Sequence, residues 1–252
     1  MNMRLGCTEE NFVHAEQLIH AAVKEKPDVL VLPETWNTGF FPKEDLAELS
    51  CQDGSEVRGR IGSLARQYGV NIVAGSVSNL RDGRVFNTAM IFNREGVCVA
   101  EYDKTHLITP MGEQRCYIAG DHLCSFTLDG VNCGVVICYD IRFPELTRSL
   151  ALQGMDMLFV VSQWPKERIT QLHTLLAARA IENQAYVVSC NSCATAGQTV
   201  YGGRSTVIDP VGRILALAGG SEDVISAVCN MQILADIRSN IPVFHDRRAE
   251  LY

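Results

Sequence analysis

Short, uninterrupted apolar runs alternate with amphipathic helical segments along most of the sequence. The first pair is a helix expected from Glu9 to Lys26, with Thr8 as its N-cap, followed by an apolar run from Val29 to Leu32. A strand without polar alternation is typical of a sheet that is covered on both faces. The pattern therefore predicts an α/β fold with a mixed sheet.

The same alternation continues toward the C-terminal end. Helices are expected from Glu56 to Tyr68, from Pro144 to Gln153 and from Lys166 to Asn183, and Thr105 to His122 is expected to form a loop over a site. Strands are expected at residues 70–77, 85–93, 97–102, 131–137, 157–161, 186–190, 206–208, 214–217 and 224–229. No linker or low-complexity tract interrupts them, so we expect one domain over residues 1–252.

The charge balance excludes some classes of function. The net charge is -7 and lysines and arginines form no cluster, which disfavours binding to nucleic acid. No apolar run is long enough to cross a bilayer, and the first residues lack the apolar stretch of a signal peptide. We therefore expect a cytoplasmic protein that acts on a small molecule, with no nucleic-acid or membrane partner.

Ten cysteines are scattered through the sequence, and many interrupt apolar runs. This placement indicates small buried side chains, not a disulfide framework. Only Cys190 and Cys193 have C-x-x-C spacing, and no second pair or nearby histidine completes a tetrahedral zinc site. A glycine-rich phosphate loop is also missing. We expect no metal and no cofactor.

Three residues with reactive side chains stand where expected strands stop: Glu34, Lys104 and Cys138. Strand ends are where α/β folds gather catalytic groups, so one site can hold all three. A cysteine nucleophile needs a base or a positive neighbour, because little of it is thiolate at neutral pH. Glu34 is a candidate base and Lys104 a candidate cation.

The sequence motifs around these residues are more specific than the spacing of the residues. VLPETWNTGF contains Glu34, EYDKTHL contains Lys104 and VVICYDIRFPEL contains Cys138, and they are followed by QWP at Gln163 and ARAIENQAYVVSCN from Ala178. In this order the segments resemble the nitrilase superfamily of carbon–nitrogen hydrolases over nearly the whole chain. The resemblance implies an α-β-β-α sandwich and a homodimer.

The resemblance also implies catalytic roles for the matching residues. Glu34 would be the general base, Cys138 the nucleophile that forms a thioester, and Lys104 the oxyanion stabiliser together with the backbone N–H of Tyr139. Glu113, seven residues before Gly120 in GEQRCYIAG, matches a second glutamate of the family. It would orient Lys104 or the substrate.

Substrate-binding residues are less constrained by the sequence. Arg142 is a candidate for a substrate carboxylate, although an ion pair with Glu145 or Asp140 is the favoured interpretation. His106, near Lys104, leaves a papain-like Cys-His peptidase open, but the residues around Cys138 do not resemble that family. Candidate pocket walls, for which core packing is an equal alternative, are Trp36, Phe40, Trp164 and Tyr201.

Within the superfamily, CYDIRFPEL, QWP and the closing NIPVF look most like the ω-amidase type, which hydrolyses ω-amides of small 2-oxo acids such as 2-oxoglutaramate. We therefore expect release of an acid and ammonia from such an amide. The alternatives are an N-carbamoyl compound, deaminated glutathione, a nitrile, or a silent member that only binds a partner.

The beginning of the sequence departs from the family pattern. Members open with an apolar strand, whereas only Met1 to Cys7 precede the first helix here. The first strand is therefore expected to be absent or shortened. Its neighbours would then keep unpaired backbone groups, so we expect a lower melting temperature than that of an extended version.

Overall fold

The computed structural model describes residues 1–40 and 45–251 and contains two β-sheets that pack face to face. The first sheet has the order β1-β3-β4-β5, with β2 also pairing with β3. Its β1 runs parallel to β3, while β3, β4 and β5 form an antiparallel meander. The strands are β1 (Val29–Val31), β2 (Cys51–Gln52), β3 (Asn71–Arg81), β4 (Arg84–Phe92) and β5 (Cys98–Asp103).

The second sheet has the order β13-β12-β9-β8-β7-β6. Its central strands β7, β8 and β9 are parallel, and the flanking pairs are antiparallel. The strands are β6 (Ser125–Leu128), β7 (Val131–Ile137), β8 (Met157–Ser162), β9 (Tyr186–Asn191), β12 (Thr206–Ile208) and β13 (Ile214–Leu217). A separate hairpin pairs β10 (Cys193–Ala196) with β11 (Thr199–Gly202).

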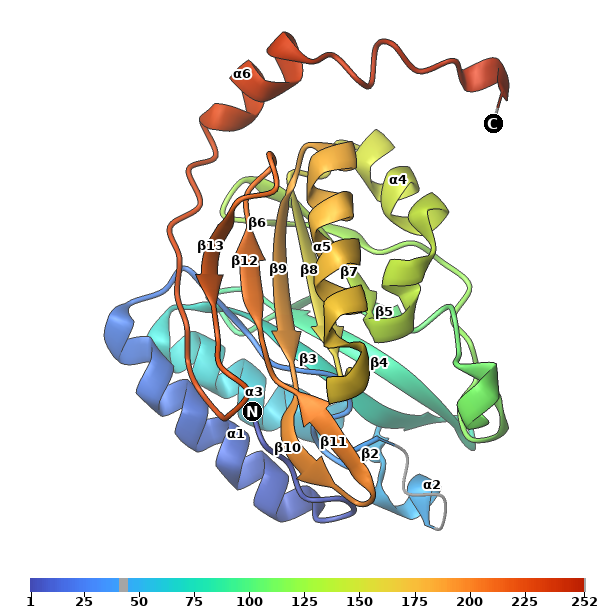
Figure 1. The fold of residues 1–252 in the computed structure, drawn as a ribbon. Helices are drawn as coiled ribbons and strands as arrows, with labels where there is room; N and C mark the ends of the chain where they lie inside the picture. Colours follow the sequence, from blue (N-terminus) through green and yellow to red (C-terminus); the bar gives the residue numbers. More distant parts are fainter. Residues whose placement is uncertain (41–44, 252) are drawn as a thin grey trace.

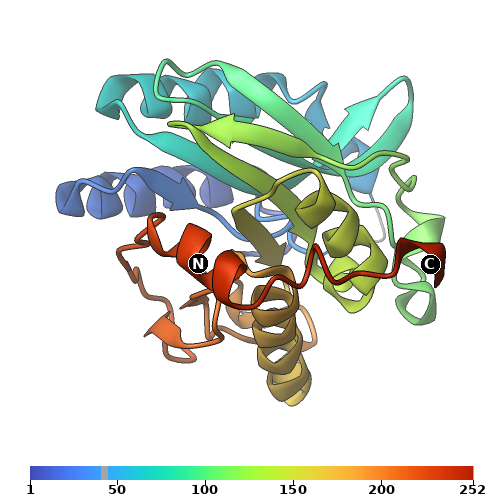
Figure 2. The ribbon, with the colours of Figure 1, turned by 90° about the horizontal axis from the view of Figure 1, so that it is seen from above.

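Helices cover the outer faces of both sheets. Figures 1 and 2 show α1 (Thr8–Ala22) and α3 (Ser55–Tyr68) outside the first sheet, and α4 (Pro144–Leu152) and α5 (Ile169–Asn183) outside the second. Two shorter helices are α2 (Leu46–Leu49) and α6 (Ile233–Asn240), the latter in the C-terminal tail. The expected α-β-β-α sandwich with mixed sheets is confirmed.

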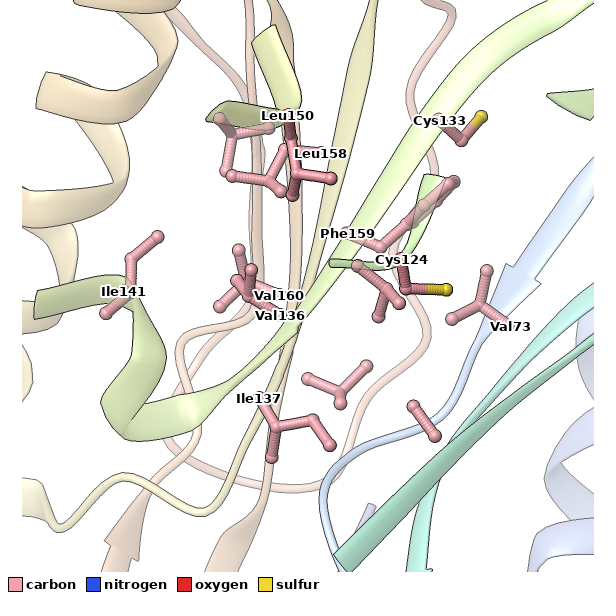
Figure 3. Close-up of a cluster of buried hydrophobic side chains, with 14 of the residues drawn as sticks. Val73, Cys124, Cys133, Val136, Ile137, Ile141, Leu150, Leu158, Phe159 and Val160 are labelled. Carbon is pink, nitrogen blue, oxygen red and sulfur yellow. The ribbon is translucent and has the colours of Figure 1, made fainter. Parts of the chain in front are cut away.

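The largest apolar cluster lies where the second sheet meets α4, α5 and the first sheet. Figure 3 shows Leu150 of α4 beside Leu158 of β8, while Phe159 points toward Val73 of the first sheet. Successive side chains of a strand point to opposite faces, so both neighbours of this sheet require apolar residues. This explains why β8 is apolar from Met157 to Val161.

Helix positions agree with the sequence prediction better than helix ends do. In α3 the apolar residues recur at helical spacing and are buried, and Gly69 ends the helix with a left-handed φ of 59°. The first helix ends earlier than expected, at Ala22, and continues only as a 3-10 turn to Glu25. Its N-cap is Cys7 without a side-chain cap bond, so the Thr8 cap prediction was wrong.

The expected strand at 224–229 was also wrong: these residues belong to no helix or strand and pair with no strand of the described chain. The period-two pattern is real, because Ile225 and Ala227 are half-buried while Val228 is 91% exposed. However, the segment borders a cavity of about 920 Å³, and the unpaired edge of β1 borders the same cavity. A strand needs a neighbour for its backbone hydrogen bonds, and here the neighbouring position is open.

The structure also describes the cysteines, the possible metal-binding groups and the length and apolar character of the helices. All ten cysteines have free thiols. Over residues 1–40 and 45–251, histidine, cysteine and acidic side chains form no group of three that is arranged to hold a metal ion. Within the same ranges no helix has the length and apolar character needed to span a membrane.

Candidate active site

Cys138 directly follows β7 and begins a 3-10 turn over Cys138–Arg142. Its φ is +49°, a left-handed value that is uncommon for a residue with a side chain. Such strain is kept where the surrounding structure enforces it, and it is concentrated at functional sites. The thiol is only 2% exposed and faces a cavity between the sheet edges.

Glu34 follows β1 and Pro33, at the same edge of the sandwich. The chain comes very close to β3 here, and a Cβ at Gly75 would lie 2.0 Å from the carbonyl oxygen of Pro33. Only glycine permits this approach, which lets the N–H of Ser76 donate to Pro33 at 3.0 Å. The Glu34 side chain is thereby directed into the interior, where it is fully buried.

Lys104 directly follows β5 and is also fully buried. Its backbone N–H donates to Asn87 and its carbonyl accepts from Gly120, both at 2.9 Å. A Cβ at Gly120 would lie 2.2 Å from the carbonyl oxygen of Asp103, so this glycine is required for the loop to close over the lysine. The loop predicted over 105–122 is therefore packed against the site.

The ammonium group of Lys104 lies between two buried carboxylates. Nζ donates to Oε1 of Glu34 at 2.9 Å and to Oε1 and Oε2 of Glu113 at 2.8 and 3.1 Å. Glu113 is held in turn by the backbone N–H of Ile108 at 2.7 Å. The sequence prediction that Glu113 orients Lys104 agrees with this geometry.

Two partners of Glu34 were missed in the sequence. Asn87 donates from Nδ2 to Oε1 of Glu34 at 2.9 Å, and the backbone N–H of Gln163 donates to Oε2 at 2.8 Å. The Gln163 side chain also donates to the carbonyl oxygen of Glu34 at 2.6 Å. A buried asparagine inside an apolar strand needs a partner, and this was the available signal for Asn87.

The cavity beside Cys138 is lined by side chains from the loops and turns that follow strands of both sheets and from the β10–β11 hairpin. Phe40, Trp164 and Tyr201, three of the four candidate pocket walls, border it, and so do Tyr139 and Arg142. The complete lining is Phe40, Ile108, Met111, Cys138, Tyr139, Arg142, Gln163, Trp164, Pro165, Arg168 and Tyr201.

Trp36 is the expected pocket residue that the structure places elsewhere. Its ring is fully buried against Phe12, with centroids 4.7 Å apart, and its Nε1 donates to the carbonyl oxygen of Ala74 at 2.7 Å. It belongs to the apolar cluster between α1, α3 and the first sheet. The residue follows Glu34 closely, but residues 34–38 form a turn in which Thr35 has a φ of +36°, so the chain changes direction between the two side chains and proximity in sequence was misleading.

Arg142 does not form the ion pair that was favoured from the sequence. Its Nη2 donates to Oε1 of Gln171 at 2.8 Å, and its guanidinium carbon lies 4.8 Å from the centroid of the Trp164 ring. Asp140 is buried and bonded to other groups. A guanidinium therefore lines the cavity, and no salt bridge within the described residues neutralises it.

His106 is not placed as the base of a Cys-His peptidase. Its Nδ1 lies 2.9 Å from Oδ1 of Asp140, and its ring stacks on Phe143 with centroids 3.7 Å apart. The charged groups that act on the Cys138 thiol are Glu34 and Lys104. The papain-like alternative has no geometric support.

Comparison with known proteins places this arrangement in a family. The family model described as carbon-nitrogen hydrolase matches residues 1–239. The chain belongs to this family. Its members hydrolyse carbon–nitrogen bonds other than peptide bonds, and the buried Glu34, Lys104, Glu113 and Cys138 are the polar centre of the hydrolase.

Individual relatives indicate which members of the family this chain is similar to. The hydrolase is 41% identical to the 2-oxoglutaramate amidase of Bacillus subtilis (strain 168) over 247 residues, which cover 98% of this chain and 95% of the relative. It is 31% identical to omega-amidase NIT2 of Xenopus tropicalis over 260 residues, covering 96% and 91%. A CN-hydrolase superfamily protein from Xanthomonas campestris has a similar structure, with a TM-score of 0.91, 28% identity, and coverage of 98% and 94%.

Burial dominates the electrostatics of the hydrolase centre. Burial, reinforced by the negative charge of Glu34, raises the pKa of the Cys138 thiol well above its ordinary value, although Lys104 acts in the opposite direction. Burial also raises the pKa of Glu113, against the attraction of Lys104. Burial alone would lower the pKa of Lys104, but Glu34 and Glu113 outweigh it and raise that pKa. The resting site therefore holds a neutral thiol beside a lysine cation.

A neutral resting thiol has a measurable signature. We expect the difference in absorbance at about 240 nm between the parent hydrolase and Cys138→Ala to show no thiolate step as the pH rises from 5 to 9, because the raised pKa keeps Cys138 protonated. A thiolate–imidazolium pair would instead absorb across this range, since paired cysteines have strongly lowered pKa values. A step below pH 7 would contradict the neutral thiol.

Proposed function

We propose that the chain hydrolyses the terminal amide of a small 2-oxo acid, such as 2-oxoglutaramate, to the acid and ammonia. The observation that carries the proposal is the buried Lys104 held between Glu34 and Glu113, beside a strained cysteine that faces a cavity. This arrangement provides a nucleophile, a base and a cation for amide cleavage. The names of the relatives support the 2-oxo acid amide as substrate.

Acylation begins with proton transfer from Cys138 to Glu34 as the sulfur attacks the amide carbon. The C–S bond forms while the carbonyl π pair moves to oxygen, and this oxyanion faces Nζ of Lys104 and the backbone N–H of Tyr139. Fixed donors stabilise charge that develops only in the transition state, so they raise the rate instead of tightening ground-state binding. The C–N bond then breaks, Glu34 returns the proton to nitrogen, and ammonia leaves a thioester.

Deacylation repeats the sequence with water. Glu34 accepts a proton from water, the hydroxide attacks the thioester carbon, and Lys104 again faces the oxyanion. The C–S bond breaks and the proton returns to the sulfur, so the acid is released and the neutral thiol is restored. The Glu34 carboxylate therefore serves as base, acid and base in turn. Three hydrogen-bond donors keep this carboxylate fixed in position.

We assign Arg142 to the carboxylate of the substrate. Its guanidinium lines the cavity with Cys138, rests on the Trp164 ring and, among residues 1–40 and 45–251, has the neutral Gln171 as its hydrogen-bond partner. A guanidinium binds two carboxylate oxygens at once, and stacking on an aromatic ring holds the fork in one plane. Arg142 thus favours an amide that carries an acid group at its other end.

Arg142→Met is expected to raise KM for 2-oxoglutaramate by about 10²-fold, because a charge-assisted fork to a carboxylate contributes about 1.5–3 kcal/mol. The kcat should change little, since the carboxylate is bound equally in the ground and transition states. For an amide of similar length without the carboxylate, kcat/KM should be nearly unchanged. Steady-state kinetics with both substrates measures this, and an equal loss on both would remove Arg142 from substrate recognition.

Ammonia release from a panel of compounds tests the substrate class. We expect the fastest release from ω-amides of 2-oxo acids, and slower release from N-carbamoyl amino acids, deaminated glutathione and nitriles. Carbamoyl cleavage would also release carbon dioxide, and a nitrile substrate has no amide oxygen to face Lys104. Faster turnover of nitriles than of amides would overturn the substrate assignment, and no turnover by the folded protein would favour a silent binding member.

We also propose that the chain forms a homodimer and works in the cytoplasm. Ile181 of α5 is 52% exposed and Val211 is 46% exposed, and the two lie beside the same glycine turn on the outer face. Exposed apolar side chains that lie together favour an interface. The ten free thiols are suited to a reducing compartment. A monomer mass in sedimentation at micromolar concentration would contradict the dimer.

A further inference from the structure

Asp140 is a fully buried carboxylate that the mechanism above does not use. It stands two residues after the nucleophile, and its two oxygens receive hydrogen bonds from both sides of the site. Oδ2 accepts from the backbone N–H of Ile137 at 3.0 Å and from the hydroxyl of Tyr102 at 2.8 Å. A buried carboxylate is costly unless it is bonded in this way, so its position is closely determined.

The other oxygen binds the loop that follows Lys104. Oδ1 accepts from the backbone N–H of His106 at 2.9 Å and from the hydroxyl of Thr105 at 3.1 Å, and it lies 2.9 Å from Nδ1 of His106. The stacking of His106 on Phe143 adds a second contact between the same two segments. One carboxylate thus joins residues 102–106, which carry Lys104, to residues 137–143, which carry Cys138.

We infer that Asp140 is a positioning residue that sets the distance between the Cys138 sulfur and the Lys104 ammonium group. Cys138 has a left-handed backbone, and Ile137 immediately before it donates to Asp140, so the carboxylate holds both ends of the strained residue. Lys104 comes from the other sheet, and its position relative to the nucleophile depends on contacts that cross between the sheets. Asp140 provides such contacts, and the inference rests on the proposed amidase chemistry.

Asp140→Asn is the direct test, because the amide keeps the size of the side chain but replaces one acceptor oxygen with a donor. Whichever way it is oriented, at least two of the donors lose their acceptor. We expect kcat for 2-oxoglutaramate to fall by about 10²-fold, as a shift of about 1 Å between reacting groups has an effect of this size. KM should stay within about threefold, since the substrate carboxylate is bound by another residue.

Asp103→Asn is the matched control. Asp103 is also a buried acid, directly precedes Lys104, and binds Arg81 and Thr88 instead of the nucleophile turn. We expect it to alter the melting temperature but to leave kcat within about threefold of the parent, since neither of these partners lies in the segment that carries Cys138. If the two variants lost kcat to the same degree, Asp140 would be a structural acid only.

A second variant and a second readout keep the inference testable if Asp140→Asn folds poorly. Thr105→Val removes one donor to Asp140 and should lower kcat by a few-fold. In the double variant with Asp140→Asn it should add no further loss of kcat, because both changes act on one contact. Alkylation of Cys138 by iodoacetamide, followed by peptide mass, needs no substrate and should slow about tenfold in Asp140→Asn. An unchanged alkylation rate or additive losses would overturn the inference, whatever the substrate proves to be.

Discussion

Replacing Cys138 by alanine is expected to lower ammonia release by about 10⁴-fold or more, because loss of a covalent nucleophile removes both half-reactions. The remaining groups still bind the amide and present Lys104 to its oxygen, so some rate above that of water should remain. The side chain is small and buried, and the change removes one sulfur atom. The melting temperature should therefore change little compared with the activity.

Cys133→Ala is the matched control for this experiment. Cys133 lies on β7, the strand that Cys138 directly follows, and is equally buried, but it does not line the cavity that Cys138 faces. We expect Cys133→Ala to be less stable by about 1 kcal/mol while keeping nearly full activity. More than a tenth of the parent activity in Cys138→Ala would remove this residue as the nucleophile.

The residues at strand ends could be predicted from the sequence because local pattern determines them. The expected strands stop before Glu34, Lys104 and Cys138, and strand ends are where α/β folds gather catalytic groups. The resemblance of the surrounding motifs supplied Glu113 and the roles of these residues. All four lie within one buried cluster.

What the sequence did not reveal depends on packing between segments far apart in the chain. Asn87 and Gln163 bind Glu34 from other strands, and no local pattern states which buried amide will face which acid. Arg142 was expected to pair with a nearby acid, but Asp140 is already bound by four donors. The Trp36 side chain lies in the apolar core, and its direction likewise depends on packing between distant segments.

Lys104→Met is the second change with a large expected effect, and it acts on both catalysis and stability. Loss of the oxyanion donor should lower kcat by about 10²–10³-fold. The variant also leaves Glu34 and Glu113, both without solvent exposure, facing each other with no cation between them. Removing one partner of a buried ionic group destabilises a protein by about 3–5 kcal/mol.

The stability loss in Lys104→Met should depend on pH in a definite direction. Burial already raises the pKa of Glu113 above 4.5, and Lys104 is the cation that holds it down, so its removal raises that pKa further. A carboxyl group with a raised folded-state pKa contributes stability below its unfolded pKa and loses it as the pH rises through the folded value. The difference in melting temperature from the parent should therefore be small near pH 5 and larger at pH 8.

The double variant Lys104→Met with Glu113→Gln separates the two effects. Of the two carboxylates beside residue 104, Glu34 alone then remains, so most of the stability lost at pH 8 should return. The kcat should stay as low as in Lys104→Met, because the cation is still missing. Thermal melts at pH 5 and pH 8 with kinetics on the same samples measure both. A stability loss that is the same at both pH values, or that persists in the double variant, would show that it arises from the packing of the methionine side chain and not from the uncompensated charge of the two buried acids.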